Sequence, residues 1–473
     1  ARKAGASVEP SAVDSLETAA LRSLDEDAYA LEAAHDYARA GLDPDAIAVL
    51  QARLSQAAGR VDPLVAYTLG WLHGRSGDAA SADRLYAAAR ALPADYCFPF
   101  RLESVSVLQA AIAASAQDAR APYYLGNVLY DHQPEAAVSA WEKARALDPG
   151  FARVHRNLAF AYARVEGDLA GAVASQEKAV GIEKREPRLY YELDQYLAWS
   201  HAPLATRLAR LTESPATVAS REITASRLAR VQLLLGRPDD ALQTLAGTRF
   251  HVWEGERGVS DVYLQARLAR GRRKLAAAQP AAALEEFQAA LTVPPNLEVG
   301  QAAGSQLAAA HHHRGLALEA LGRRDDAQAA FRESAASPAP LAEAHFWIGR
   351  SLEKLGRAAE ARAHFQRLAA ARPAAVDASR PLENRVAGLE RRAEAQYQRA
   401  LGLLGLARAA EARAALTRAL EDDPDLVAAA ALRDTLAATL TAATVRPPGA
   451  AARVRPRVEA TRPMVEAPPE RNR

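Results

Sequence analysis

Cysteine, methionine, aromatic residues and long apolar runs are all scarce in this chain of 473 residues. The single cysteine, Cys97, excludes an intrachain disulfide and fits a reducing compartment. It lies in the apolar stretch from Tyr96 to Phe100, so we interpret it as a small buried hydrophobe. No window approaches the roughly 20 apolar residues that a membrane-spanning helix needs, and no signal peptide is visible. These absences lead us to expect a cytoplasmic protein that does not contact a membrane.

The remaining composition favours helices. Aromatic residues make up 6% of the chain and β-branched residues are sparse, whereas alanine, leucine, arginine and glutamate dominate. The dominant types are strong helix formers, so composition predicts an all-α protein. The formal net charge is +2, which provides no global field that would draw the chain to nucleic acid. We therefore expect no nucleic-acid partner.

The two ends of the chain differ from the rest. The first residue is alanine and the one methionine is Met464, which leads us to expect a fragment of a longer protein. Residues 446–473 hold seven arginines and three glutamates, a net charge of 7 − 3 = +4, among several prolines. A Pro- and Arg-rich segment without an apolar period predicts a disordered tail over residues 441–473. Residues before about Ser15 are also expected to be unstructured.

A pattern recurs along the chain with a period of about 34 residues. A small residue in a first helix precedes a turn, and a second helix then carries alanine, a large residue and alanine, often before proline. Small residues let two helices cross closely, the large residue fills the gap between them, and proline ends the second helix. The small residues that mark the eight matches are Gly70, Gly126, Ala159, Ala229, Gly271, Gly315, Gly349 and Ala400.

The turns inside these units carry a second signal. Three of them read Leu-Gly-Arg, with Gly236, Gly322 and Gly356 at the centre. Glycine at this position predicts a left-handed residue that ends the first helix. Eight matches in fixed order are typical of tetratricopeptide repeats (TPR), and this chain resembles that group. The resemblance implies a right-handed all-α superhelix of roughly eight or more helix-turn-helix repeats.

The pattern divides the chain into five predicted regions. A lead-in and a degenerate helix pair precede the first array, and a region of irregular helices separates it from the second array. The predicted boundaries are 1–60 for the lead-in, 61–186 for the first array, 187–260 for the irregular region, 261–440 for the second array and 441–473 for the tail.

The repeat fails most clearly in an aromatic and charged segment between Arg249 and Gly258. Loops that leave a regular scaffold often carry function. His251 and Glu254 have the chemistry of an acid–base pair, with Trp253 as a stacking surface for a sugar. The favoured interpretation is that Phe250 and Trp253 pack onto the array while the charges stay in water. No catalytic residue is assigned for this reason.

Metal and cofactor sites are not predicted. His311, His312 and His313 are consecutive, and consecutive helical side chains point about 100° apart, so they cannot converge on one ion. His311 is expected to take a helix-packing position instead. No phosphate-binding loop, zinc-type spacing or nucleophile elbow occurs in the sequence.

The concave groove is the predicted binding surface, because the TPR resemblance places particular first-helix positions on the inner face. Aromatic, amide and guanidinium groups at these positions suit a peptide, a carboxylate or a carbohydrate. A solvated face with no ligand would also carry polar residues, so both interpretations stay open. The predicted groove residues are Tyr123, Asn127, Tyr130, Arg153, Arg156, Asn157, Phe160, Tyr191, Glu192 and Gln195.

Two of these positions resemble the carboxylate clamp of chaperone-binding TPR domains. Asn127 and Asn157 stand in the two asparagine positions of that clamp. Tyr123 stands where the clamp needs lysine, and Glu192 stands where it needs a cation. The departures argue against binding of a chaperone tail.

Five stretches carry a more specific resemblance, which covers about residues 60–340. They are Tyr124–Asp131, His155–Ala159, Tyr191–Gln195, Arg249–Gly255 and Pro295–Gly300. In these stretches the chain resembles a bacterial group in which an N-terminal domain of unknown function precedes a TPR array. That domain is β-rich and similar to the mutarotase-like sandwiches of carbohydrate-active enzymes. Val252 and Glu256 depart from the usual proline and glycine of the group.

The resemblance implies that this chain is the C-terminal half of a larger protein, with the 249–258 insert facing the sandwich domain. Two functions follow. The first is a scaffold that binds a protein, or the N-terminal domain of the same polypeptide, through its concave groove. The alternative is the helical part of a carbohydrate-active enzyme, with His251, Trp253 and Glu254 near a sugar.

Overall fold

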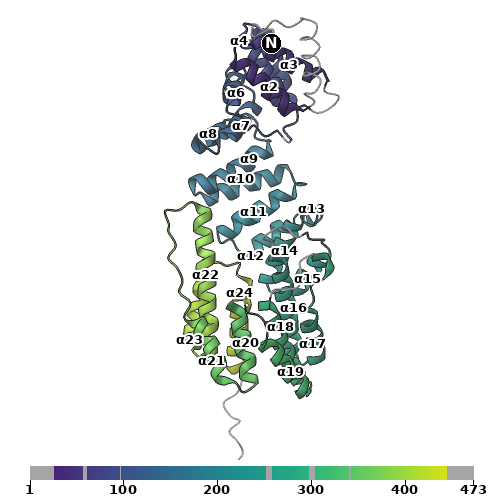
Figure 1. Ribbon diagram of the computed structural model, residues 1–473, viewed down its shortest axis with the longest axis vertical. Helices are drawn as coiled ribbons and strands as arrows, with labels where there is room; N and C mark the ends of the chain where they lie inside the picture. The colour runs from purple at the N-terminus through teal and green to yellow at the C-terminus, as the bar shows by residue number, and fades with distance from the viewer. Residues whose placement is uncertain are drawn as a thin grey trace, which may run out of the picture.

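The computed structural model describes residues 26–56, 61–95, 97–251, 258–297, 304–339 and 342–444. Within these ranges the regular structure is entirely helical. The predicted tail, the residues before Ser15, and Trp253 and Glu254 of the insert lie outside the described residues. Figure 1 shows an elongated array with the first helices at one end and two side-by-side columns at the other.

The upper part and the middle of the array follow the chain in order. The upper helices are α2 (Asp27–Arg39), α3 (Asp43–Gln56), α4 (Pro63–Arg75), α5 (Ala79–Ala91), α6 (Glu103–Ala114), α7 (Arg120–Leu129) and α8 (Pro134–Leu147). The middle contains α9 (Ala152–Ala161), the π-helical turn η1 (Tyr162–Glu166), α10 (Leu169–Ile182), α11 (Pro187–Trp199), α12 (Leu204–Leu211) and α13 (Pro215–Ala219).

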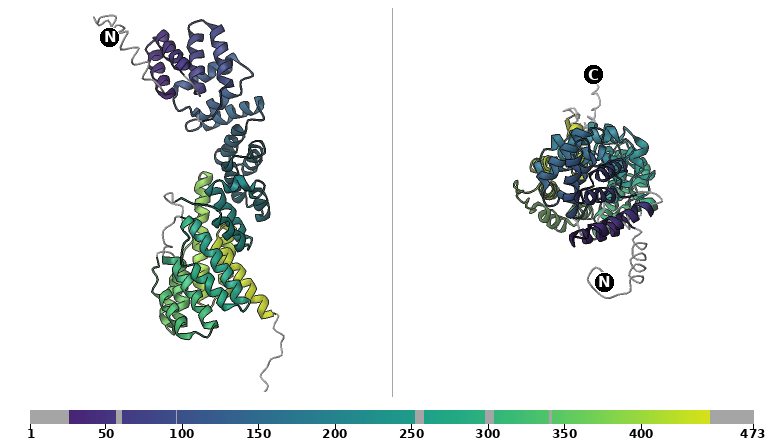
Figure 2. Two further views of the ribbon diagram at one scale, coloured as in Figure 1. Left: turned by 90° about the vertical axis from the view of Figure 1, so that its right-hand side faces the viewer. Right: turned by 90° about the horizontal axis from the view of Figure 1, so that it is seen from above.

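The lower part holds two columns. The first comprises α14 (Glu222–Leu234), α15 (Pro238–Ala246), α16 (Gly258–Ala276), α17 (Pro280–Ala289), the short η2 (Pro295–Leu297), α18 (Gly304–Ala320) and α19 (Arg324–Ala335). The second comprises α20 (Ala342–Lys354), α21 (Ala358–Ala369), α22 (Leu382–Gly405), α23 (Ala409–Asp422) and α24 (Val427–Thr444). Because the second column runs beside the first, the chain folds back on itself (Figures 1 and 2).

The predicted repeats are confirmed as antiparallel helix pairs. All eight small-residue matches fall in the first helix of a pair that packs on the next helix. The pairs are α4/α5, α7/α8, α9/α10, α14/α15, α16/α17, α18/α19, α20/α21 and α22/α23. The left-handed turns are confirmed too, since Gly236, Gly322 and Gly356 have φ of 71°, 76° and 75°. The region 187–260 departs from the repeat through the short helices α12 and α13.

A glycine–aromatic contact fixes how closely the two helices of a pair approach. A Cβ atom on Gly271 in α16 would lie 2.3 Å from Cε1 of Phe287, a fully buried ring in α17. The same contact recurs between Gly315 and Phe331 in the next pair. The aromatic ring therefore fills the space that the missing side chain leaves, as the sequence pattern predicts.

We expect Gly271→Ala to lower the free energy of unfolding by roughly 1–3 kcal/mol, because the new methyl group overlaps a ring that cannot move. Gly181→Ala is the matched control, since Gly181 in α10 has nothing within 4 Å of its would-be Cβ. It should raise stability by roughly 0.5–1 kcal/mol through helix propensity. Denaturant midpoints measure both changes, and equal effects at the two sites would contradict this account.

A buried arginine fastens the second column to the middle of the array. Arg207 in α12 is 2% exposed and donates to both oxygens of Asp194 in α11, at 2.8 and 2.9 Å. Its Nη2 also donates to Asp425, 218 residues further along, at 2.9 Å. Burial opposes the charge of Arg207, but its hydrogen bonds to both carboxylates outweigh that effect and raise its pKa. Nε of Arg227 forms an ion pair with Oδ2 of Asp194 at 3.0 Å.

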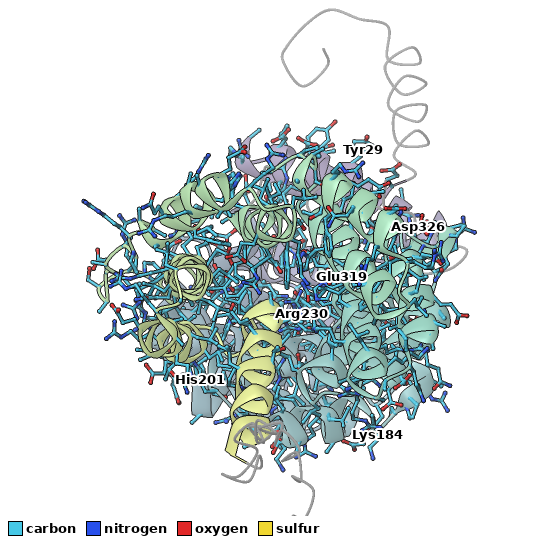
Figure 3. The ribbon with its side chains drawn as sticks, turned by 90° about the horizontal axis from the view of Figure 1, so that it is seen from below. Tyr29, Lys184, His201, Arg230, Glu319 and Asp326 are labelled. Atoms are coloured by element: carbon cyan, nitrogen blue, oxygen red, sulfur yellow. The ribbon has the colours of Figure 1, made fainter. Side chains whose placement is uncertain are left out.

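Two further contacts join the second column to the rest of the array. Leu382, the first residue of α22, packs among Ala159, Ala163 and Tyr196 of the middle helices. Beyond Asp425, α24 runs along α14 and α16, between the two columns (Figure 3). The last helix therefore occupies the inner face of the lower repeats.

Arg207→Met should destabilise the junction by about 3 kcal/mol, because it leaves Asp194 and Asp425 buried with less compensation. The measurement is hydrogen–deuterium exchange of the backbone amides of α24, which should become faster. Arg210→Met, one helical turn away and 43% exposed, is the control and should leave α24 unchanged. Unaltered exchange in the Arg207 variant would show that the ion pairs do not hold the column.

Candidate functional site

The first helices of three successive pairs present a continuous polar network on α7, α9 and α11. Asn157 in α9 donates its side-chain amide to Oδ1 of Asn127 in α7 at 2.8 Å. The same oxygen accepts from the indole of Trp141 at 3.1 Å. Asn127 thereby links its own second helix to the next repeat, and Asn157 extends the link toward Arg156.

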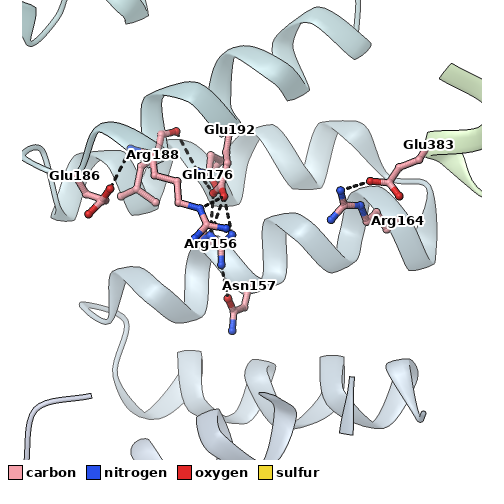
Figure 4. A network of polar contacts seen from close by, with 9 residues as sticks. Arg156, Asn157, Arg164, Gln176, Glu186, Arg188, Glu192 and Glu383 are labelled. Carbon is pink, nitrogen blue, oxygen red and sulfur yellow. Dashed lines mark hydrogen bonds and ion pairs between the residues drawn. The ribbon is translucent and has the colours of Figure 1, made fainter. Parts of the chain in front are cut away.

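Glu192 forms ion pairs with two guanidinium groups of this surface. Arg156 donates to both oxygens of Glu192 at 2.6–3.0 Å, and Arg188 donates from Nε at 2.9 Å (Figure 4). Gln176 adds an amide donor at 3.3 Å. Burial opposes the charge of Arg156, but its hydrogen bonds to Glu192 outweigh that effect and raise its pKa. Glu192 is 8% exposed, so it acts as a fixed internal anion that orients two arginines.

A cavity of about 480 Å³ opens beside this network. We call it the arginine cleft. Its charged wall consists of Arg156, Arg164, Arg188, Arg221 and Glu192, a net charge of 4 − 1 = +3. Its other lining residues are Phe160, Tyr191, Gln195, Tyr196 and Ile223. The cleft therefore combines an excess of positive charge with aromatic surface.

Each arginine of the cleft is held differently. The Arg164 guanidinium stacks 3.7 Å above the Phe160 ring and forms an ion pair with Glu383 at the start of α22 (Figure 4). Arg188 is 54% exposed, and Arg221 is also exposed. No hydrogen bond or ion pair joins the Arg221 guanidinium to another residue in the described ranges. At least two guanidinium groups are thus available to an incoming anion.

The structure brings five of the ten predicted groove residues to this cleft, namely Arg156, Phe160, Tyr191, Glu192 and Gln195. Asn127 and Asn157 lie in the adjoining network. Tyr130 stacks on Trp141 and meets Phe160 at 5.3 Å. Sequence reasoning did not single out Tyr196 or Arg221 as site residues. Arg221 directly precedes α14, so the register of the next first helix is the signal that would have pointed to it.

Two predicted groove residues lie elsewhere. Tyr123 is 6% exposed, because its ring packs between Tyr124 and Phe151 at 5.2 and 4.7 Å, and it does not line the cleft. Arg153 forms an ion pair with Asp95 toward the upper repeats. A tyrosine in a first helix therefore fills the space between neighbouring repeats here, where the inward register suggested an exposed ring.

The insert is described only at its start. Phe250 is 3% exposed and packs in the cluster that includes Leu297. Its N–H donates to the carbonyl of Asn296 at 2.8 Å, so two of the specific sequence stretches adjoin in space. The backbone N–H of His251 donates to Glu222 at 2.6 Å, while its side chain is 58% exposed. Nothing further is assigned to the acid–base interpretation of this segment.

The three histidines do not converge. His311 is partly exposed and pairs with Glu333 at 2.9 Å, which differs from the packing role expected for it. His312 is buried beside the ring of Phe331, and its Nδ1 lies 2.9 Å from Ser351. His313 is buried with Nδ1 2.8 Å from the carbonyl oxygen of Ala309. Among the described residues, no three potential ligands are grouped as a metal site would require.

The comparisons with known proteins can now be placed beside this geometry. The sequence model described as "Tetratricopeptide repeat" matches residues 343–375, which span α20 and α21. The match therefore identifies one tetratricopeptide repeat in this chain, on the α20/α21 pair.

Among solved structures, the TPR protein YrrB, which has an unusual peptide-binding site, is 20% identical and covers 40% of this chain and 92% of its own, with a TM-score of 0.30. MamA from Desulfovibrio magneticus RS-1 is 20% identical, and the match covers 42% of this chain and 98% of MamA, with a TM-score of 0.25. The human IFIT1 dimer with m7Gppp-AAAA is 15% identical, and the match covers 88% of this chain and 95% of the IFIT1 chain, with a TM-score of 0.30.

The search for membrane-spanning helices gives a negative result. Across the described helices of the TPR array, none combines the length and apolar character that crossing a bilayer requires.

Burial lowers the pKa of His313 to about 3, and it holds that of His312 well below its usual value. The folded chain keeps these rings neutral, whereas the unfolded chain protonates them near pH 6.5. Stability should therefore be full above pH 6.5 and fall as the pH drops toward 3. At pH 5 the loss from His313 alone is about 2 kcal/mol.

The check is the difference in unfolding free energy between pH 7.5 and pH 5. His313→Gln should reduce that difference, because glutamine does not titrate, while the exposed control His251→Gln should preserve it. A pH dependence that is identical in all three proteins would exclude His313 as its source.

Proposed function

We propose that this protein is a scaffold that binds an acidic segment of a partner protein in the arginine cleft. TPR arrays bind protein and peptide ligands on their inner faces because the repeats form extended concave surfaces. The observation that carries the proposal is the charge of the cleft. Four arginines and one buried carboxylate line it, and adding Glu383 still leaves 4 − 2 = +2.

The geometry favours carboxylates as the recognised group. A guanidinium presents a planar fork of donors that matches a carboxylate in a bidentate pair. Glu192 occupies the Nε and Nη2 donors of Arg156 and so fixes this guanidinium before a ligand arrives. Arg188 and Arg221 at the exposed rim supply further donors. Preorganised donors lower the conformational entropy that binding costs.

The remaining groups favour a peptide over a nucleic acid. Gln195 on the wall offers an amide donor and acceptor that can pair with a peptide backbone. Phe160 and Tyr191 provide apolar surface for one or two side chains. Nucleic-acid binding draws on a basic stripe that follows many phosphates. The arginine cleft is instead a compact site in a chain of net charge +2.

The test uses a fluorescein-labelled hexapeptide of alternating glutamate and glycine, with binding followed by fluorescence polarisation. Arg188→Ala and Arg221→Ala should each weaken binding about tenfold, the equivalent of one charge-assisted hydrogen bond of about 1.5 kcal/mol. Both side chains are exposed, so neither variant should change the fold. Arg332→Ala on α19, far along the array and also exposed, is the matched control and should bind like the original.

A peptide with glutamine in place of glutamate separates charge from shape. It should bind at least tenfold more weakly, and binding of the acidic peptide should weaken with salt. Equal affinity for the two peptides would overturn the proposal. So would a labelled single-stranded oligonucleotide that binds through Arg188 and Arg221 while neither peptide binds, since the cleft would then recognise phosphate.

A further inference from the structure

A second cavity lies inside the lower part of the array, apart from the arginine cleft. It has a volume of about 530 Å³ and is enclosed by residues of α16, α18, α20, α22 and α24. We call it the inner chamber. One wall is formed by Leu432 and Leu436 of α24, the helix that lies between the two columns (Figure 3). The volume falls within the range of roughly 300–1,000 Å³ that small-molecule sites occupy.

Two arginines line this chamber, Arg272 in α16 and Arg350 in α20, and Arg350 is paired with Glu353. No hydrogen bond or ion pair connects the Arg272 guanidinium to any other residue in the part of the chain that the structure describes. Burial disfavours its charge and lowers its pKa, and Glu343 offsets this only in part from a distance. A partly buried guanidinium with no protein partner offers its donors to an anion that enters the cavity.

The contrast with Arg207 makes this point sharper. Arg207 is 2% exposed, and two carboxylates satisfy it at 2.8–2.9 Å, whereas Arg272 is partly exposed. Its role in fastening the array is complete without a ligand. Arg272 contributes no such fastening, although it faces a cavity large enough for a ligand. The structural explanation that fits Arg207 therefore does not fit Arg272.

The rest of the chamber defines what kind of anion it accepts. Leu316, Phe346, Trp347 and Leu404 give it an apolar body. Glu343 stands at the polar end, where it accepts from the Trp347 indole at 3.2 Å. A carboxyl group at this place disfavours a doubly charged ligand such as a phosphate monoester. A single carboxylate on an aromatic or aliphatic body suits both the polar and the apolar walls.

We propose that the inner chamber binds a small amphipathic monocarboxylate, with Arg272 pairing with the carboxylate and the apolar walls enclosing the hydrocarbon part. This site is independent of the arginine cleft, since the two cavities share no lining residue. Arg272 is the specificity-determining residue. Because a guanidinium–carboxylate pair needs the ligand's charge, an uncharged isostere should lose most of its affinity.

The experiment measures binding of 4-phenylbutyrate and 4-phenylbutanamide to the full chain by isothermal titration calorimetry. The acid should bind at least tenfold more tightly than the amide. Arg272→Met should abolish this preference. Arg273→Met is the matched control, because Arg273 is the next residue and is exposed, with its guanidinium on the carbonyl of Gly236. Circular dichroism checks that both variants keep their helices.

A cavity-filling variant provides a second test that leaves Arg272 in place. Leu404→Trp should exclude the acid by occupying the chamber. Equal binding of acid and amide would overturn the proposal, as would acid binding that survives both Arg272→Met and Leu404→Trp. The proposal would also be overturned if the original protein bound neither 4-phenylbutyrate nor any straight-chain carboxylate from butyrate to decanoate. None of these results bears on peptide binding in the arginine cleft.

Discussion

The buried bridge from Asp194 through Arg207 to Asp425 is the constraint on which the lower half of this array depends. A tandem array needs only contacts between neighbouring repeats and leaves its inner face open. Here Arg207, which is 2% exposed, donates to Asp425, a residue 218 positions further along the chain. Burying the three charges is favourable only if all of them are present together. The bridge therefore specifies one arrangement of the two columns, because any other leaves a buried charge unpaired.

The second column, by folding back on the array, divides its inner face into two regions with different properties. In the lower region α24 fills the space between the columns, and the inner chamber is what its alanine-rich surface leaves unfilled. In the middle region the start of α22 reaches the array but stops at its edge, where Glu383 pairs with Arg164. The arginine cleft stays open beside this contact, with its charge only partly neutralised.

The fold was largely predictable because each repeat is determined locally. A small residue in one helix and a large one in the next specify a helix pair, and eight pairs specify an array. Folding back was not predictable, since Asp194, Arg207 and Asp425 show no periodicity that would connect them. The irregular helices α12 and α13 also follow from this bridge, because α12 must present Arg207 toward two distant carboxylates.

The candidate site was predictable to the extent that it follows the helical register. Positions such as Arg156 and Gln195 were found because the repeat alternates inward and packed faces. Tyr123 was placed in the groove by the same rule, and its ring is buried, because register does not decide whether a large side chain enters the gap to the next repeat. Arg221 was missed because it lies inside the predicted irregular region 187–260, directly before α14, where the register of the repeat was not followed.

The specific stretches are best explained by the places where the regular scaffold is interrupted. Within Tyr191–Gln195, Glu192 orients the arginines of the cleft and Asp194 belongs to the closing bridge. The side-chain amide of Asn296 donates to the carbonyls of Leu245 and Thr248 at 2.8 Å, at the end of α15. These residues supply partners to charges and backbone groups that no neighbouring repeat can reach. Residues of one short motif thus line the arginine cleft and join the columns, so both features are built from the same turns of α11.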